Sequence, residues 1–300
     1  MEKINIVFLG TGQAVPTEKR NHSSILLQYE DENILVDCGE GTQRQFRKAK
    51  LNPCKLTRIL ITHWHGDHIL GLPGLLQTLA LNGYNRTLHV YMPRGTIHYF
   101  HNIMRMFVYK DTIKLEIHEI DEGKVFDKGK FYIQAAKMKH DTPCLAYSFI
   151  EKDKTRIDKA KMKKLKIKPG PELKNIKNGE SIKINGKTIK AKDITYFEKG
   201  RKITFIMDTV INDGAAELAK NSDLLVCEST YSEQEKDLAA EYKHLTARQA
   251  AEIAKKSKSQ RLILTHISQR YDYKEKILLQ EARKVFKNVL VAEDLMRFEL

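Results

Sequence analysis

The chain has 300 residues, of which 41% are hydrophobic, so it can build a substantial core in one large or two ordinary domains. Fifty-two lysines and arginines against 38 aspartates and glutamates give a net charge of +14, which favours polyanionic partners such as nucleic acid or an anionic membrane surface. Because the sequence shows no secretory signal, no membrane-spanning apolar run and no CxxC pair among four cysteines, we expect a cytoplasmic protein without membrane insertion, disulfides or a thiolate zinc site.

Short apolar runs typical of strands alternate with stretches that have the period of helices. The strands are predicted at residues 4–10, 23–29, 33–39, 58–63, 88–92, 113–120, 131–138, 144–150, 202–208, 223–229, 261–266 and 289–294. The helices are predicted at residues 42–50, 71–82, 211–221, 245–256 and 277–287. Strands followed by helices in two halves indicate an α/β fold, with helices packed outside the sheets.

Residues 151–196, called here the basic segment, interrupt this alternation. They hold 15 lysines and arginines against 6 aspartates and glutamates, a net charge of +9 out of the chain's +14. The segment is poor in large apolar residues and contains the turn sequence from Lys168 to Pro171. We interpret it as an inserted arm that projects from the body of a single domain, residues 1–300, although a solvated insertion without a task would have the same composition.

The strongest chemical pattern follows the strand predicted at 58–63, where His63, His65, Asp67 and His68 lie within six residues. Imidazole nitrogen and carboxylate oxygen are common zinc ligands, and a strand end can aim them into one pocket. Alternate residues of an extended chain share a face, so His63 and His65 can bind one metal ion. Asp67 and His68, beyond the turn, are then directed toward a second site.

Three more candidate ligands end later apolar runs, namely His140, Asp208 and His266. A lone histidine at a strand end is more often a structural residue than a ligand, so the first motif is what makes these three significant. Together they complete a set of seven. Five other histidines are interpreted as surface or packing residues. His98 and His101 lie at i, i+3 spacing on a helical stretch, and no companion ligands are recognised near His22, His89 and His118 in the sequence.

Several motifs carry a family resemblance that covers essentially the whole chain. The sequence from Thr62 to His68, THWHGDH, resembles the signature of the metallo-β-lactamase superfamily. Within it, FLGTG at 8–12, DCGEGTQ at 37–43, the Pro-Gly-Pro at 169–171 and HISQRY at 266–271 resemble the ribonuclease Z family of short-form tRNA 3′-processing endonucleases. The resemblance implies a four-layer αβ/βα sandwich with a two-metal site.

The resemblance also implies the roles of the candidate ligands. Two zinc ions per subunit are expected, the first bound by His63, His65 and His140, the second by Asp67, His68 and His266, with Asp208 bridging them. The expected reaction is attack of a metal-activated hydroxide on a phosphodiester of precursor tRNA, leaving a 3′-hydroxyl on the tRNA and a 5′-phosphate on the trailer. Asp67 would orient the hydroxide and accept its proton. His244 would protonate the departing oxygen, although from the sequence alone it is a residue at the entry of a helix capped by Thr246.

The basic segment would recognise the tRNA through its phosphate backbone, by shape rather than by base sequence. Its expected RNA-binding residues are Lys161, Lys163, Lys164, Lys166, Lys168, Gly170, Pro171 and Lys174. The resemblance further suggests a homodimer in which the arm of one subunit reaches the tRNA cleaved by the other. In the glycine-rich turn, Asp37, Thr42 and Gln43 precede and begin a helix whose N-terminal amides could hold a phosphate or help to shape the pocket.

Other functions on the same scaffold share most of these ligands. They are a thioesterase, a β-lactamase, a hydrolase of small or cyclic phosphodiesters, a diiron oxidoreductase and an RNA-binding protein without catalytic activity. The missing signal sequence argues against a secreted β-lactamase, the complete ligand set against a degenerate enzyme, and Gly66 with no flavin domain against the oxidoreductase. Manganese, iron and cobalt also suit histidine and carboxylate ligands, so zinc is an expectation based on prevalence.

Overall fold

The structure is a computed structural model that describes residues 2–108, 112–177, 179–184 and 187–300. The chain forms two compact units. Unit 1 comprises residues 1–126, 133–149 and 202–300, and unit 2 comprises residues 127–132 and 150–201. Unit 2 therefore contains the whole basic segment, the residues that flank it and residues 127–132. Among the described helices, none combines the length and the apolar character that crossing a lipid bilayer requires.

The first sheet has seven strands in the order β18-β1-β2-β3-β4-β5-β6. These strands are β1 (Ile4–Gly10), β2 (Ser24–Tyr29), β3 (Glu32–Val36), β4 (Arg58–Leu60), β5 (Thr87–Pro93), β6 (Lys114–Ile120) and β18 (Arg297–Glu299). Pairing is antiparallel from β18 to β3 and parallel from β3 to β6. The parallel strands therefore end at one edge of the sheet, where side chains from separate loops can meet.

The second sheet also has seven strands, in the order β17-β16-β15-β14-β9-β8-β7. These are β7 (Gly123–Asp127), β8 (Phe131–Lys137), β9 (Leu145–Glu151), β14 (Lys202–Ile206), β15 (Leu224–Glu228), β16 (Leu262–Thr265) and β17 (Val289–Val291). The four strands from β14 to β17 are parallel. Apart from β7, whose residues are only partly buried, these strands were all expected from the apolar runs of the sequence.

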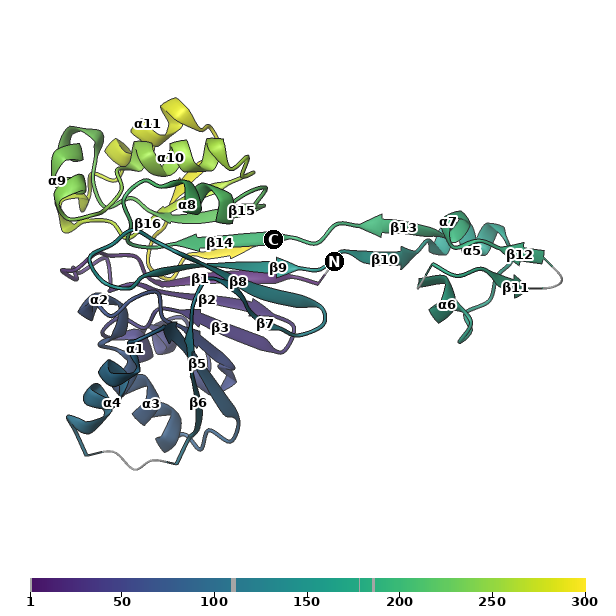
Figure 1. The fold of residues 1–300 in the computed structure, drawn as a ribbon, viewed down its shortest axis with the longest axis horizontal. Coiled ribbons are helices and arrows are strands. Elements are labelled where there is room, and N and C mark those ends of the chain that lie inside the picture. Colours follow the sequence, from purple (N-terminus) through teal and green to yellow (C-terminus); the bar gives the residue numbers. More distant parts are fainter. Residues whose placement is uncertain (1, 109–111, 178, 185–186) are drawn as a thin grey trace. The chain divides into compact units, whose positions relative to one another are not determined.

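Helices cover the outer face of each sheet in unit 1 (Figure 1). The helices α1 (Thr42–Lys48), α3 (Leu72–Leu81) and α4 (Ile97–Arg105) pack on the first sheet, and α8 (Asp213–Leu218), α10 (Ala247–Lys256) and α11 (Lys276–Val285) on the second. Between the sheets, Tyr29 of β2 meets Phe149 of β9 with ring centroids 5.3 Å apart. The four-layer αβ/βα sandwich expected from the family resemblance is confirmed.

Unit 2 has a small hydrophobic core of its own. Buried Met162, Ile167, Ile176 and Ile194 pack together, with partly buried apolar residues around them. Its elements are the strands β10 (Lys154–Ile157), β11 (Ile182–Ile184), β12 (Lys187–Ile189) and β13 (Thr195–Glu198) and the helices α5 (Lys159–Lys164), α6 (Leu173–Lys177) and α7 (Ala191–Ile194). The composition led us to expect little burial within this segment, yet its few isoleucines gather into one cluster.

Candidate metal centre

The motif from Thr62 to His68 forms a tight turn between a strand and a short helix. β4 ends at Leu60, earlier than expected, and α2 (Gly66–Ile69) begins directly after His65. His63 is therefore in an extended loop rather than in the strand, but its ring still lies 4.7 Å from that of His65, centroid to centroid. Asp67 and His68 both lie in α2, and His68 Nε2 is 3.4 Å from Asp67 Oδ2.

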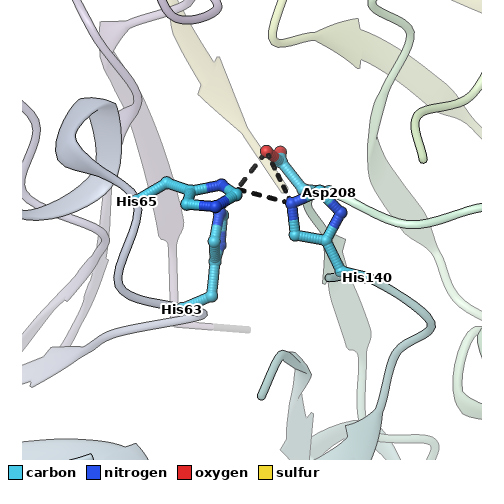
Figure 2. A group of neighbouring side chains, drawn as sticks. All are labelled: His63, His65, His140 and Asp208. Atoms are coloured by element: carbon cyan, nitrogen blue, oxygen red, sulfur yellow. Dashed lines mark hydrogen bonds and ion pairs between the residues drawn. The ribbon is translucent and has the colours of Figure 1, made fainter. Parts of the chain in front are cut away.

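A first set of four side chains converges from three separate segments (Figure 2). One ligand atom from each of His63, His65, His140 and Asp208 lies within 4.8 Å of the others. His65 Nδ1 and His140 Nε2 are 3.2 Å apart, and Asp208 Oδ2 lies 3.5 Å from His63 Nε2. Three imidazoles and a carboxylate at this spacing can coordinate one ion.

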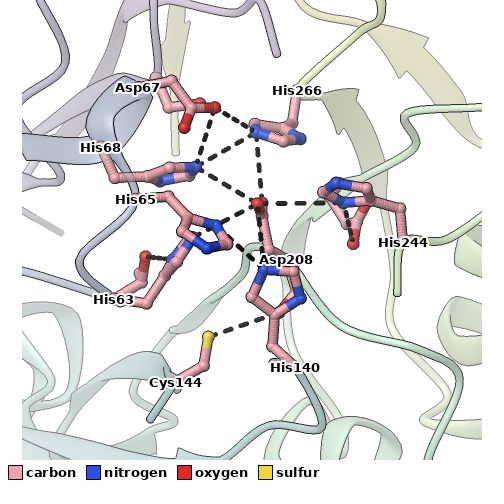
Figure 3. Close-up of polar contacts among 12 residues, drawn as sticks. His63, His65, Asp67, His68, His140, Cys144, Asp208, His244 and His266 are labelled. Carbon is pink, nitrogen blue, oxygen red and sulfur yellow. Dashed lines mark hydrogen bonds and ion pairs between the residues drawn. The ribbon is translucent and has the colours of Figure 1, made fainter. Parts of the chain in front are cut away.

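A second set lies beside the first and shares Asp208 with it (Figure 3). Ligand atoms of Asp67, His68 and His266 also lie within 4.8 Å of one another. His68 Nε2 and His266 Nε2 are 3.2 Å apart, and Asp67 Oδ2 lies 3.3 Å from His266 Nε2. Asp208 Oδ1 lies 3.2 Å from His266 Nε2, and its Oδ2 lies 3.4 Å from His68 Nε2 and 3.5 Å from His63 Nε2, so its carboxylate contacts both sets.

Four of the five histidines have their outer nitrogen engaged by a protein group. The outer Nδ1 of His63 faces Thr62 Oγ1, that of His68 faces Asp37 Oδ2, that of His140 faces the Lys243 carbonyl, and that of His266 faces Thr230 Oγ1. A neutral imidazole carries one ring proton. When Nδ1 donates this proton to the outer partner, the lone pair of Nε2 is directed into the centre. For His65 the inward nitrogen is Nδ1, and Nε2 lies 3.4 Å from Asp141 Oδ1.

Asp37 is the hub of one half of this outer network. Its carboxylate accepts hydrogen bonds from the backbone N–H and hydroxyl of Thr62, at 2.8 Å each, and from His68 Nδ1 at 2.7 Å. It is almost fully buried. The oxygens of Asp37 are therefore occupied by the turn that carries the candidate ligands. Thr42 is likewise engaged, since its hydroxyl donates to the Gly39 carbonyl.

Glu228 is the hub of the other half and was given no role by the sequence analysis. It is fully buried at the end of β15. It accepts hydrogen bonds from the Thr209 N–H at 2.7 Å and from the Thr230 hydroxyl at 2.8 Å, and His244 Nδ1 lies 3.3 Å away. The signal that could have found it is the one that found Asp208, a polar residue that ends an apolar strand.

The buried polar atoms fit a group that carries positive charge. His63 Nε2 and Asp208 Oδ1 are buried without a hydrogen bond, which is costly unless another ligand satisfies them. Burial, with the charge of His68, lowers the pKa of His63. Burial alone would raise the pKa of Asp208, but His266 and His68 outweigh it and hold that pKa well below its usual range. A neutral imidazole beside an ionised carboxylate is the state that divalent cations bind.

His244 lies beside the same group of side chains (Figure 3), in the loop between α9 (Lys236–Glu241) and α10. Its ring centroid is 5.4 Å from that of His266 and 5.6 Å from that of His140. Burial alone would lower its pKa, but the carboxylates of Glu228 and Asp208 outweigh that effect and raise the pKa to about 9. These two carboxylates therefore favour the protonated form of His244, which can donate a proton.

The backbone adopts unusual conformations at the residues that aim these groups. Asp37, Lys243 and His266 have φ angles of 58°, 56° and 57°, in the left-handed region that side chains other than glycine rarely adopt. The Lys243 conformation presents its carbonyl to His140. Gly39 permits the close approach of the motif, because a Cβ there would lie 2.4 Å from the Asp67 carbonyl oxygen.

The remaining histidines follow the sequence interpretation only in part. His22 is buried, with Nε2 3.0 Å from the Ala14 carbonyl, and His98 and His101 are exposed on α4. His89 and His118 do have a companion ligand, because a ligand atom of Glu116 lies within 4.8 Å of both. The sequence could not reveal this cluster, since the strands that bring it together are separated along the chain.

The expected RNA-binding residues all lie in unit 2, on and after α5. The side chains of the six lysines in this set are exposed, and Pro171 is exposed as well. Met162 of α5 is buried in the core of unit 2, so Lys161, Lys163 and Lys164 occupy the other faces of the helix. Unit 2 thus presents a cationic surface and keeps its apolar residues inside.

Comparisons with known proteins bear on both the fold and the centre. Residues 4–158 match the family described as anti-Pycsar protein Apyc1, and residues 162–267 match the β-lactamase superfamily domain. The ribonuclease Z of Methanothermobacter thermautotrophicus is 40% identical over 299 residues, covering 99% of this chain and 97% of the relative. That of Bacillus cereus is 41% identical over 305 residues, covering 98% and 99%. The crystal structure of human tRNase Z, short form, is 29% identical with a TM-score of 0.72, covering 98% of each chain.

The outer network predicts a strong effect of Asp37 on metal binding. In Asp37→Asn the side chain keeps its size but loses the charge that holds the His68 proton, so the affinity for zinc should fall about 10- to 100-fold. The affinity is measured by competition with a chromophoric zinc chelator, and circular dichroism monitors the fold. Asp31→Asn, an exposed aspartate in the turn before β3, should bind zinc like the wild type. Equal affinities in the wild type and Asp37→Asn would contradict the prediction.

Proposed function

The chain belongs to the ribonuclease Z family of the metallo-β-lactamase superfamily, and on that basis we propose that it is a zinc-dependent endoribonuclease that removes the 3′ trailer from precursor tRNA. The observation that carries the proposal is the pair of adjacent ligand sets that share Asp208. Two ions at such sites suit the hydrolysis of a phosphodiester, because both the attacking and the departing oxygen carry negative charge during the displacement.

We propose that the seven ligands divide between two zinc ions in each subunit. His63, His65 and His140 hold the first ion, and Asp67, His68 and His266 hold the second. Asp208 would bridge them, which is supported by the position of its Oδ2 near His63 of the first set and His68 of the second, and of its Oδ1 near His266. Bound there, the ions would lower the pKa of a shared water and stabilise charge on the phosphate oxygens.

The other steps fall to side chains of this chain. Asp67 Oδ2 accepts a hydrogen bond from the Ala14 N–H at 2.9 Å, which fixes the carboxylate beside the centre. There it orients the attacking water and accepts its proton. His244, held as an imidazolium by Glu228, protonates the departing 3′ oxygen of the tRNA. Cleavage of that bond leaves a 3′-hydroxyl on the tRNA and a 5′-phosphate on the trailer.

The lysines of the basic segment supply affinity for the RNA backbone in this proposal. Their exposed side chains on a separately folded unit can bind phosphates without taking part in the reaction. A hydrolase of small phosphodiesters or thioesters has no evident use for a segment of net charge +9, and an RNA-binding protein without activity has none for seven converging ligands. The homodimer and the cytoplasmic location stay predictions.

Cleavage of a precursor tRNA tests the proposed reaction directly. With a 3′-extended precursor tRNA, the wild type should cut at the acceptor end. His65→Ala removes a ligand of the first ion, so it should lower the rate at least about 100-fold on the tRNA and on bis(p-nitrophenyl) phosphate alike. His101→Ala, an exposed histidine on α4, is the matched control and should keep both activities. Metal-dependent hydrolysis of the small diester without any cutting of the tRNA would refute the tRNA assignment.

Replacing the α5 lysines tests the role of unit 2. The triple variant Lys161→Gln, Lys163→Gln, Lys164→Gln should raise KM for precursor tRNA, and it should make the slope of log KM against log salt shallower by about 2. The rate on bis(p-nitrophenyl) phosphate should not change. The control variant replaces three exposed lysines of unit 1, Lys276, Lys284 and Lys287. An equal effect of both triple variants would show that the lysines act only through total charge.

The pH profile tests the proton donor. His244 donates only when protonated, and the carboxylate of Glu228 raises its pKa and so favours that form. Glu228→Gln removes the partner that raises this pKa most, so the alkaline decline of kcat/KM on precursor tRNA should begin about 1 to 3 pH units lower. His244→Ala should lower kcat about 10²- to 10⁴-fold. Glu241→Gln, an exposed residue of α9, serves as the control, and an unshifted profile in Glu228→Gln would exclude this role of Glu228.

A further inference from the structure

Two histidines and a glutamate meet on neighbouring strands away from the seven ligands. β5 and β6 are parallel, with His89 opposite Glu116 and Tyr91 opposite His118. The residues that alternate with them, including Leu88 and Val90, belong to the apolar cluster under the helices. His89, Glu116 and His118 therefore share the other face of the sheet, because side chains alternate along a strand.

The three side chains have the spacing of metal ligands. His89 Nδ1 lies 3.2 Å from His118 Nε2 and 3.2 Å from Glu116 Oε2, and all three ligand atoms lie within 4.8 Å of one another. In a tetrahedral zinc site, bonds of about 2.0 to 2.1 Å put two ligand atoms roughly 3.3 Å apart. The facing nitrogens of the candidate metal centre, His65 Nδ1 and His140 Nε2, show the same 3.2 Å separation.

Neighbouring groups fix the orientation of the cluster. The His118 ring stacks on Tyr91 at 4.5 Å with an interplanar angle of 15°, and Tyr91 stacks in turn on Phe126 at 5.2 Å. Lys114 Nζ lies 3.8 Å from Glu116 Oε1, the oxygen that does not face His89. The ring nitrogens and one carboxylate oxygen are thus held together by packing and by charge.

We propose that His89, Glu116 and His118 bind one divalent transition-metal ion, separate from the two ions of the metal centre. Two imidazoles and a carboxylate form a ligand set that suits zinc, with the remaining position open to water. The side chains of His89 and Glu116 are 25% and 43% exposed, so an ion can reach them from solvent. β6 ends the order of its sheet, and the ion ties this edge strand to β5.

Metal counting tests this proposal independently of RNA cleavage. Wild type and variants are dialysed to equilibrium against buffers of increasing free zinc. The zinc bound per chain is then measured by inductively coupled plasma mass spectrometry. The wild type should take up one ion more than His89→Ala or His118→Ala at the same free zinc. His101→Ala is the matched surface control and should bind as the wild type does. Glu116→Gln, which alters no ring packing, should weaken the additional ion at least about tenfold.

The location of the ion separates this site from the metal centre. His65→Ala should lose zinc from the centre but keep the ion that depends on His89 and His118. Zinc should also raise the urea midpoint of unfolding of the wild type more than that of His118→Ala, since an ion that binds only the folded state stabilises it. Equal zinc binding by the wild type, His89→Ala and His118→Ala, with all three folded by circular dichroism, would overturn the proposal.

Discussion

Two buried carboxylates outside the ligand set, Asp37 and Glu228, orient the side chains on which the candidate metal centre depends. Each takes hydrogen bonds from a threonine and from a histidine, and so fixes which ring nitrogen faces inward. Burying a carboxylate is costly unless its oxygens accept hydrogen bonds. Here each carboxylate also accepts a hydrogen bond from a backbone N–H group. On one side, Asp37 accepts the hydrogen bond from His68 Nδ1 and leaves His68 Nε2 facing the candidate centre. On the other side, Glu228 raises the pKa of His244.

The fold makes this network possible because its strands end where the loops must meet. Asp37, Glu228, Asp208 and His266 all follow apolar strands, in two different sheets, and each is buried. Their backbones are constrained as well, since Asp37 and His266 adopt a left-handed conformation that costs about 1 to 3 kcal/mol. Such strain persists only where surrounding contacts impose it. The two large apolar clusters between sheets and helices supply those contacts, so core packing and ligand geometry are parts of one cooperative structure.

The sequence was sufficient for the features that depend on local order. All seven converging side chains were found from the motif at His63 to His68 and from polar residues that end apolar strands. This was possible because the hydrophobic pattern alone indicates where a strand ends. The hydrogen bonds that Asp37 and Glu228 form with His68 and His244 could not be predicted, because spacing along the chain does not show which distant residues meet. The pairing of His89 with Glu116 and His118 required the register of two parallel strands. In unit 2, Met162 and Ile176 are outnumbered by lysines, and composition concealed the core that they form.

The lysines proposed to bind a large polyanion lie in unit 2, whereas the candidate ligands and His244 lie in unit 1. The few buried residues of unit 2 must hold together a fold that carries most of the chain's excess charge, and like charges on one small unit oppose its compact state. Under the proposed function, phosphates bound by those lysines relieve the repulsion, so the free energy of RNA binding and the stability of unit 2 are linked. The metal centre needs the reverse condition. Its buried groups must keep their geometry before any substrate arrives, and the larger cores of unit 1 provide that rigidity. If the lysines and the candidate ligands shared one unit, the packing around the ligands would have to be weaker in order to accommodate the lysines.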